Sequence, residues 1–412
     1  MQKKPNTSPN KLRATFDQIT SPLQKFIHME ASGGIFLLIM AVVAMVFANT
    51  NSLKDFYFSF INLPVSFGFA GMELNKTLLL LVNDGLMAIF FYLVGIEIKK
   101  EILAGELSTP KKASFSIFAA IGGMVFPALV YVGLNYNGAG LQGWGIPMAT
   151  DIAFAIGVLT LLGKRVPLSL KVFLLALAIV DDLGAIMIIA IFYSGEISST
   201  YLGFAAISLF LLFLLNYAGF RNVAWGIILG CITWFCFLKS GVHATIAGVL
   251  LAFLTPAYKL NVNNEGTSEL LLDHYIHALH PWIAFFIMPV FAFFNAGVNI
   301  QGIDIGAMMV SPVTMGIMLG LLIGKPVGVL LMTFIAAKFK WADLPEGTNW
   351  GQIAAVGLIA GIGFTMSLFI SGLAFTDSDL ATNSKVGILF GSLIAMVLGY
   401  LSLLIASPKV KK

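Results

Sequence analysis

The chain has 412 residues, of which 58% are hydrophobic and only 11% are charged, and its formal net charge is +4 at pH 7. Because soluble domains carry about 25% charged residues, this composition excludes an ordinary soluble protein and predicts an all-α polytopic membrane protein. The net charge is too small, and the charges are too scattered, to indicate a nucleic-acid partner.

Long apolar stretches divide the chain into three parts. Residues 1–30 are polar and basic and predict a cytoplasmic lead, residues 31–406 predict a single transmembrane domain, and residues 407–412 predict a basic cytoplasmic tail. Most of the apolar stretches reach the approximately 20 residues that a helix needs to cross a bilayer. About twelve spans are expected, at residues 31–49, 77–99, 114–134, 140–162, 170–193, 200–219, 222–238, 241–257, 278–298, 308–337, 350–375 and 384–406.

The lysines and arginines between these spans orient the chain. Of the 24 such residues, 19 fall in segments on the same side as the N-terminus, 4 fall on the opposite side, and Lys325 lies within a span. Cytoplasmic loops of membrane proteins carry the excess of positive charge. The pattern therefore predicts that both termini lie in the cytoplasm.

The first external segment is unusually apolar. From Asp55 to Glu73 it alternates aromatic and small residues around Asn62, Leu63 and Pro64. A period of two is typical of β-strands, so the segment predicts a β-hairpin on the external face. Exposed apolar surface favours a partner, which makes the hairpin a candidate contact in a homodimer; the alternative is that it rests among lipid headgroups.

Four ionisable residues fall at the centres of predicted spans. Asp181 and Asp182 are neighbours in AIVDDLGAI, Asp151 lies in ATDIAFAIG, and Lys325 lies in GLLIGKPVG. A charge at the centre of a membrane helix costs about 2.5–3.5 kcal/mol on insertion scales, so such residues are rare and are usually functional. If all four were ionised, three carboxylates and one ammonium would give −2, which favours cations or protons. The alternatives are structural hydrogen bonding for the aspartates and a structural ion pair for Lys325.

Two spans are interrupted at a similar depth. Thr150 and Asp151 follow Pro147 and can hydrogen-bond locally in place of the helical ladder, and the stretch GLIAGIGFTMS is weakened by glycines. Broken helices in two parts of a chain point to a transport site, although close helix packing is the alternative for the glycines. Facing half-helix ends bring like partial charges together, so Asp151 could offset the positive ends and Lys325 the negative ends.

Two further carboxylates lie near opposite ends of the second span. Glu97 is near its cytoplasmic end and Asp84 near its external end. A regulatory role for Glu97 competes with that of a solvated helix end beside Lys99, Lys100 and Glu101. For Asp84 the alternative is a hydrogen-bond acceptor at a helix end.

Seven motifs together resemble the NhaA-type sodium/proton antiporters of bacterial inner membranes, and the resemblance runs from Ala31 to Leu404. The motifs are, in chain order, ATDIAFAIG, AIVDDLGAI, LKSGVHATIAGV, HALHPW, FAFFNAG, GLLIGKPVG and GIGFTMSLFI. The resemblance implies twelve transmembrane helices, with spans three to five and ten to twelve as inverted repeats. It also implies that spans four and eleven are unwound and cross at the midplane. The chain departs from some members at Ile276, where they have an acidic residue, and at Lys100, where they have arginine.

The resemblance also implies roles for individual residues. Asp181 and Asp182 match the family's cation- and proton-binding pair, and Thr150 and Asp151 match its unwound-helix polar pair. The buried lysine of the family corresponds to Lys325. Glu97 matches a position linked to pH response at the cytoplasmic funnel, and Asp84 matches another family carboxylate that we group with it. The external hairpin resembles the family's dimer contact.

The function that follows is secondary active exchange of cytoplasmic Na⁺ or Li⁺ for external protons, electrogenic and pH-regulated, in the bacterial inner membrane. No cofactor and no enzymatic activity are expected. A sodium-coupled symporter of an organic anion is the alternative, but it would need a cationic cavity, and Lys325 is the one central cation in the sequence. Two less favoured alternatives are an intramembrane aspartyl protease, which needs its aspartates on different helices, and a passive channel, which would not explain the carboxylates.

Overall fold

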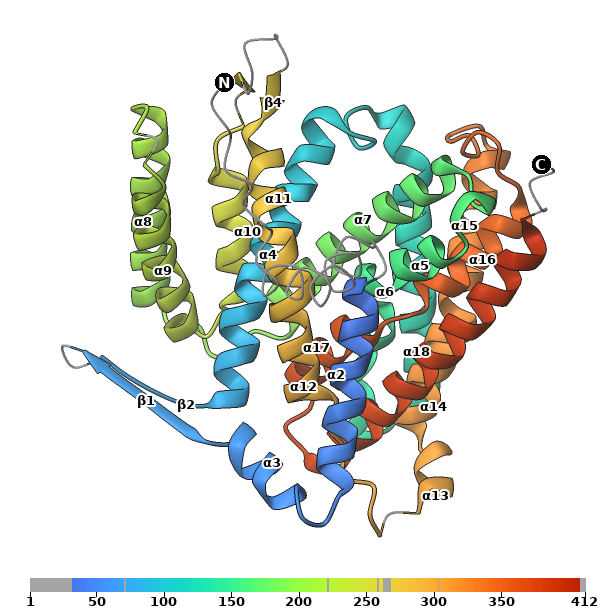
Figure 1. Ribbon diagram of the computed structural model, residues 1–412, viewed down its shortest axis with the longest axis horizontal. Helices are drawn as coiled ribbons and strands as arrows, with labels where there is room; N and C mark the ends of the chain where they lie inside the picture. Colours follow the sequence, from blue (N-terminus) through green and yellow to red (C-terminus); the bar gives the residue numbers. More distant parts are fainter. Residues whose placement is uncertain are drawn as a thin grey trace, which may run out of the picture.

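The computed structural model of the chain describes residues 32–69, 72–220, 222–257, 259–261, 268–302 and 304–407. The predicted lead, and the predicted tail apart from Ser407, lie outside these residues. The described part consists almost entirely of helices, with two short antiparallel pairs of strands. This confirms the prediction of an all-α polytopic membrane protein with a small hairpin (Figure 1).

The elements of the first half are, in chain order, α2 (Ser32–Asn49), α3 (Lys54–Ile61), β1 (Pro64–Phe69), β2 (Met72–Thr77), α4 (Leu78–Ala104), α5 (Pro110–Asn135), the 3₁₀-helix η1 (Ala139–Met148), α6 (Ile152–Leu161), the 3₁₀-helix η2 (Gly163–Arg165) and α7 (Leu168–Phe192). The next elements are α8 (Ser199–Tyr217), α9 (Val223–Ser240), α10 (Thr245–Leu254), β3 (Lys259–Asn261), β4 (Ser268–Leu270), α11 (Leu271–Trp282), the π-helical turn η3 (Ile283–Ile287), α12 (Met288–Ala296) and α13 (Ile305–Met309). The last elements are α14 (Pro312–Leu319), the π-helical turn η4 (Gly320–Gly324), α15 (Lys325–Lys338), α16 (Trp350–Ala360), α17 (Phe364–Ala374) and α18 (Ser378–Ala406).

Within the described ranges, nine helices are long and apolar enough to cross a membrane, and two bent pairs raise the number to eleven. Helix α10 is apolar but has only 10 residues, which correspond to about 15 Å. All twelve predicted spans fall on helical segments, although length and composition support nine to eleven crossings. Helix α11 begins at Leu271 and α18 at Ser378, before their predicted spans, because polar residues prolong both helices beyond their apolar parts.

The prediction of one hairpin over residues 55–73 is wrong in its first part. Most of that part belongs to helix α3, and the hairpin consists of β1 and β2, with Pro64 opposite Thr77. Tyr57 and Ile61 of α3 are four residues apart and are both buried, so the aromatic pattern also fits the helical period. The Tyr57 hydroxyl donates to the Phe293 carbonyl oxygen at 2.6 Å and attaches α3 to α12.

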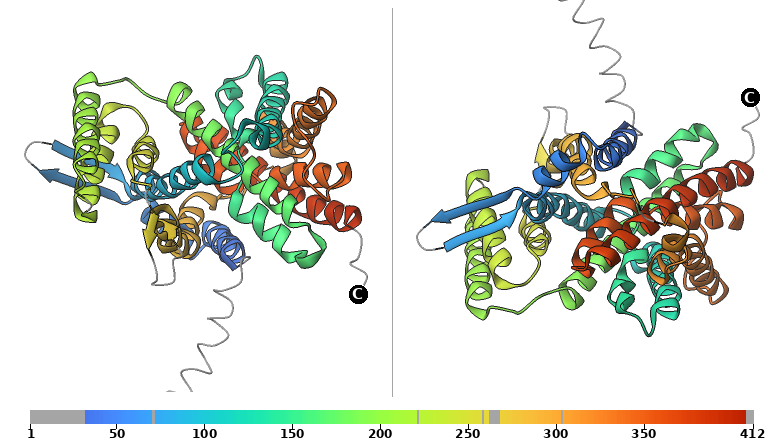
Figure 2. Two further views of the ribbon diagram at one scale, coloured as in Figure 1. Left: turned by 90° about the horizontal axis from the view of Figure 1, so that it is seen from above. Right: turned by 90° about the horizontal axis from the view of Figure 1, so that it is seen from below.

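The order of a long helix, a broken pair and a long helix occurs twice in the chain. It is formed first by α5, η1–α6 and α7, and again by α14–α15, α16–α17 and α18. This is the order that the predicted inverted repeats require. Helices α8 and α9 lie near the hairpin, at the side of the molecule away from these two repeated groups. The views from above and below show the same separation (Figure 2).

The first repeated group of helices (α5 to α7) and the second (α14 to α18) are joined by direct backbone contact at two glycines. Gly122 of α5 faces Gly328 of α15, and a Cβ added to either residue would overlap the backbone carbonyl of the other. Helix α15 carries Lys325, so this crossing helps to fix the position of the lysine. Small residues allow such close approach between membrane helices.

We expect Gly328→Ala to lower the free energy of unfolding by about 1–3 kcal/mol, because an overpacked site must shift its backbone. The matched control is Gly133→Ala, since a Cβ at Gly133 of α5 would meet nothing within 4 Å. The measurement is the thermal unfolding midpoint of the detergent-solubilised protein. Equal midpoints for the two variants would show that the backbones at Gly122 and Gly328 are not closely packed.

Candidate functional site

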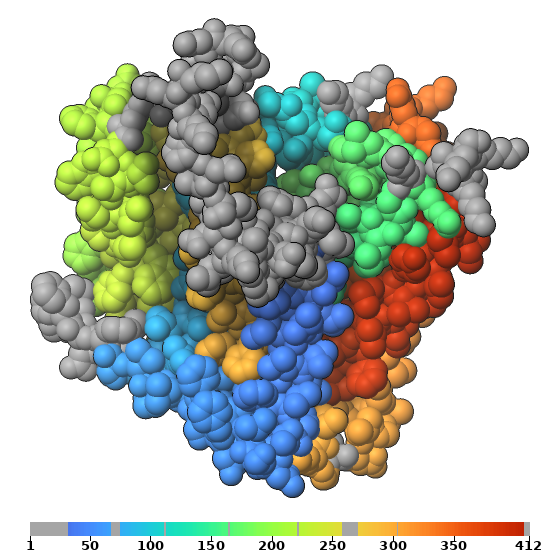
Figure 3. Space-filling view, in the orientation of Figure 1, coloured from blue at the N-terminus to red at the C-terminus, as the bar shows by residue number. Residues whose placement is uncertain are grey.

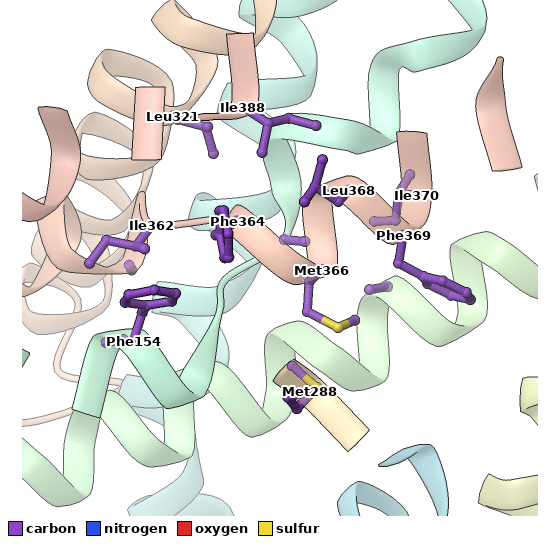
Figure 4. Close-up of a cluster of buried hydrophobic side chains, with 14 of the residues drawn as sticks. Phe154, Met288, Leu321, Ile362, Phe364, Met366, Leu368, Phe369, Ile370 and Ile388 are labelled. Atoms are coloured by element: carbon purple, nitrogen blue, oxygen red, sulfur yellow. The ribbon is translucent and has the colours of Figure 1, made fainter. Parts of the chain in front are cut away.

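The two broken helices meet at their breaks. The η1–α6 pair is bent by 43° and the α16–α17 pair by 45°. The Asp151 N–H donates to the Ile362 carbonyl oxygen at 2.6 Å, which joins the two breaks directly. Around this crossing, the ring of Phe154 from α6 meets that of Phe364 from α17 at a centroid distance of 5.1 Å (Figure 4). Buried apolar side chains thus hold the crossing in place.

Local sequence explains why the helices break here. Pro147 has no N–H to donate to the helical ladder, and Asp151 caps the following helix by accepting a hydrogen bond from the Phe154 N–H at 3.1 Å. In the second pair, a Cβ at Gly361 would overlap the Leu321 carbonyl of η4, and one at Gly363 would lie 3.1 Å from the Ala149 carbonyl oxygen at the first break. The glycines therefore permit the close approach that the crossing needs.

The Asp151 carboxylate lies between two helix N-termini. Its Oδ1 accepts from the Phe154 N–H of α6, and its Oδ2 accepts from the Thr365 N–H of α17 at 3.1 Å and from the Thr365 hydroxyl. The residue is only 1% exposed. Because helix N-termini carry partial positive charge, one carboxylate can offset both ends.

Lys325 is the first residue of α15, and its side chain reaches the C-terminal end of η1. Its ammonium donates to the carbonyl oxygen of Met148, the last residue of η1, and to Asp181 Oδ2 at 2.5 Å. The lysine is completely buried. The π-helical turn η4 directly precedes it, and a Cβ at Gly324 would lie 2.6 Å from the Pro127 Cα of α5. The ammonium thus offsets the negative end of η1 and forms a buried ion pair.

The two neighbouring aspartates of α7 have different surroundings. Asp181 Oδ2 accepts from Lys325 and, at 2.7 Å, from the Thr150 hydroxyl. In contrast, Asp181 Oδ1 and both oxygens of Asp182 have no hydrogen-bond partner among the described residues, although the two residues are at most 1% exposed. Buried polar atoms are normally satisfied. Three such oxygens therefore mark a place where a cation, a proton or water can bind.

Glu97 and Asp84 lie outside this hydrogen-bond network. They are 13 residues apart on α4, which corresponds to roughly 20 Å at the helical rise. Asp84 forms an ion pair with Lys76 at 2.5 Å, and Glu97 is half-buried near the end of α4. That end borders a hollow between α11 and the green segment at the junction of α6 and α7 (Figure 3).

The lysines beside Glu97 attach α4 to its neighbours. Lys99 donates to the carbonyl oxygens of Phe253 at 2.7 Å and Thr255 at 2.6 Å, which lie at the end of α10. Lys100 forms an ion pair with Asp273 of α11 at 2.6 Å. These residues are therefore bonded to neighbouring helices and are not simply a solvated helix end.

Sequence reasoning did not assign roles to four groups at the crossing. The Thr365 hydroxyl bonds to Asp151, the Ser392 hydroxyl accepts from the Phe364 N–H at 3.0 Å, and two backbone carbonyls, of Met148 and Ala360, accept from site residues. Thr365 stands in the glycine-rich stretch that predicts the second break, and this is the only signal that could have found it.

The fold and the site together define a class of protein: a polytopic secondary transporter with two broken helices that cross at buried charges. The family model described as Na⁺/H⁺ antiporter 1 matches residues 24–403, and the chain belongs to this family. The Na⁺/H⁺ antiporter NhaA 2 of Shewanella denitrificans is 51% identical over 381 residues, which are 92% of this chain and 94% of the relative.

Two further relatives show similar agreement. The Na⁺/H⁺ antiporter NhaA 1 of Klebsiella pneumoniae is 50% identical over 92% of this chain and 95% of its own length. The Na⁺/H⁺ antiporter NhaA of Proteus mirabilis is 49% identical over 96% of this chain and 99% of its own length. These names are those of transporters, and they confirm the family to which the sequence motifs pointed.

Proposed function

We propose that this chain is a Na⁺/H⁺ antiporter that exports cytoplasmic Na⁺, or Li⁺, in exchange for external protons. Family membership supports the type of exchange. The observation that carries the proposal is the set of three unpartnered oxygens on Asp181 and Asp182, buried beside Lys325. A carboxylate oxygen suits a hard cation such as Na⁺ and also accepts a proton.

In this mechanism, Na⁺ and protons compete for the same oxygens. Asp182 holds the transported ion, and Thr150 together with the carbonyls at the breaks can supply further oxygen ligands. Asp181 is paired with Lys325 in this structure, and this ion pair opens when a cation binds. Crossing with an empty, ionised site is disfavoured because unpaired charge is costly in the membrane, so transport of one ion depends on return of the other.

Four further features complete the proposal. Because two carboxylates can take up protons, more protons than Na⁺ can move in each cycle, which makes exchange electrogenic. Alternating access follows from one helix group rocking against the other around the crossing. Glu97 and Asp84, at opposite ends of α4, belong to the pH response. The protein lies in the bacterial inner membrane with both termini in the cytoplasm.

The contacts of Lys325 argue against symport of an organic anion. Its ammonium already donates to Asp181 and Met148, so it is committed within the site and is not directed at a separate anion cavity. Exchange needs no cosubstrate, whereas symport does.

Proton flux in everted membrane vesicles tests the proposal. Respiration acidifies the vesicle lumen and quenches a pH-sensitive dye, and Na⁺ is then added at the cytoplasmic face. We expect Na⁺ to restore the fluorescence in vesicles containing this chain, because protons leave as Na⁺ enters the lumen. No Na⁺-dependent recovery at any pH from 6.5 to 9 would overturn the proposal.

We also infer a homodimer formed through the hairpin of β1 and β2, which projects from the helices (Figure 2). Replacing residues 66–75 by a short turn keeps Lys76, which pairs with Asp84. We expect this change to convert the dimer into a monomer, measured as the protein mass in detergent by light scattering. A dimer of undiminished stability after the replacement would rule out this contact.

A further inference from the structure

One hydroxyl proton at the centre of the site faces two acceptors. Thr150 Oγ1 lies 2.7 Å from Asp181 Oδ2 and 2.8 Å from the carbonyl oxygen of Ala360. Thr150 is completely buried. A threonine hydroxyl has one proton and two lone pairs. It can therefore donate to only one of these oxygens at a time.

The second acceptor belongs to the other broken helix. Ala360 is the last residue of α16, and the final carbonyls of a helix have no partner within that helix. The break separates it from α17, whose first N–H, of Phe364, bonds to Ser392 instead. Within the described residues, the Thr150 hydroxyl is the donor that reaches the Ala360 carbonyl. A buried carbonyl that loses its donor is disfavoured.

The charge on Asp181 decides which acceptor the hydroxyl serves. When Asp181 is ionised, the carboxylate is the stronger acceptor because charge-assisted bonds are stronger, and the Ala360 carbonyl goes without a donor. When Asp181 Oδ2 takes up a proton, its ion pair with Lys325 is lost, and the new O–H can donate to Thr150 Oγ1. The Thr150 proton is then free to donate to Ala360, and the result is a continuous chain of two hydrogen bonds.

We propose that the Thr150 hydroxyl is a relay that passes the protonation of Asp181 to the second broken helix. The relay rests on the proposed exchange and deepens it. Only one proton is gained, on Asp181 Oδ2, and the Thr150 proton turns from one acceptor to the other without leaving its oxygen. The titratable groups that surround the relay are Lys325 from α15, Asp182 from α7 and Asp151 from the first break.

The relay assigns Thr150 a role that a cation ligand alone would not have. It acts in the proton-carrying half of the cycle, in which Asp181 is protonated and the Ala360 carbonyl is satisfied. In the sodium-carrying half the carboxylate stays ionised and no proton needs to be relayed. Removing the hydroxyl should therefore separate the two halves, provided that Na⁺ is saturating.

Two transport modes in proteoliposomes test this separation. One is Na⁺-driven proton flux, and the other is counterflow of radioactive Na⁺ against unlabelled Na⁺ at saturating concentrations on both sides. Thr150→Val removes the hydroxyl at nearly constant volume, and Thr150→Ser keeps it. The control is Thr333→Val, since Thr333 of α15 is completely buried and its hydroxyl bonds only to carbonyls of its own helix.

We expect Thr150→Val to reduce proton flux by about 10-fold or more, as two buried groups lose their partners. Counterflow at saturating Na⁺ should fall clearly less, because loss of one oxygen ligand among several weakens Na⁺ binding but interrupts no relay. Thr150→Ser and Thr333→Val should retain both modes. Equal loss of both modes in Thr150→Val, or loss of neither, would overturn the relay. The absence of Na⁺-dependent proton flux in the wild type would instead overturn the proposed exchange, so the two failures are distinguishable.

Discussion

Replacing Asp182 by asparagine is expected to abolish Na⁺/H⁺ exchange while leaving the protein folded in the membrane. Both oxygens of Asp182 are buried without a hydrogen-bond partner among the described residues, so the amide breaks no existing bond. The amide has nearly the same volume but carries no charge to hold Na⁺ and does not take up a proton at physiological pH. We expect the Na⁺-dependent dye recovery in everted vesicles to fall to the level of vesicles without the protein.

Two other aspartate variants complete this test. Asp343→Asn changes an exposed aspartate in the loop between α15 and α16, and it should exchange at the wild-type rate. Asp181→Asn should change the apparent Na⁺ affinity or the coupling, because its carboxylate is shared with Lys325 and Thr150. Wild-type dye recovery in Asp182→Asn would remove Asp182 from the ion pathway.

Lys325→Met should be the most destabilising substitution at the site. It leaves Asp181 as a buried carboxylate without its ammonium partner and removes the donor to the Met148 carbonyl. Breaking a buried ion pair by removing one partner costs about 3–5 kcal/mol. We therefore expect a marked fall in the thermal unfolding midpoint of the detergent-solubilised protein, together with loss of exchange.

The double variant Lys325→Met with Asp181→Asn shows whether the pair is the cause. A buried ion pair replaced by neutral groups is often tolerated, so the double variant should regain most of the stability that Lys325→Met loses. Exchange should not return, because one of the two carboxylates is gone. If the two substitutions lowered the midpoint additively, they would not be energetically coupled, and the ion pair would not be the source of the stability.

The membrane fold could be predicted from the sequence because its signals are local. Long apolar runs define the helices, and the four charges at their centres stand out because each is costly there. The breaks also had a local signal in Pro147 and in the glycines around Gly361. The hairpin was misplaced because the aromatic residues of α3 fit both a strand and a helix, and only the burial of Tyr57 and Ile61 distinguishes them.

The contacts at the crossing could not be predicted in the same way. The partnership of Asp151 with Thr365 joins residues 214 positions apart, and that of Thr150 with the Ala360 carbonyl joins residues 210 apart. A backbone carbonyl has no sequence signature, since every residue carries one. Which of the two aspartates meets Lys325 likewise depends on how α7 is rotated against α15, and the sequence alone leaves both choices open.

The most direct measurement of the central claim is the number of protons released when Na⁺ binds to the purified protein in detergent. Titration calorimetry in two buffers with different heats of ionisation gives this number without any need for transport. If both ions use the oxygens of Asp181 and Asp182, Na⁺ binding should release protons, its affinity should weaken as the pH falls, and Asp182→Asn should lose both effects. The account would be contradicted if Na⁺ bound to the wild type with the same affinity from pH 6.5 to 9 and released no protons.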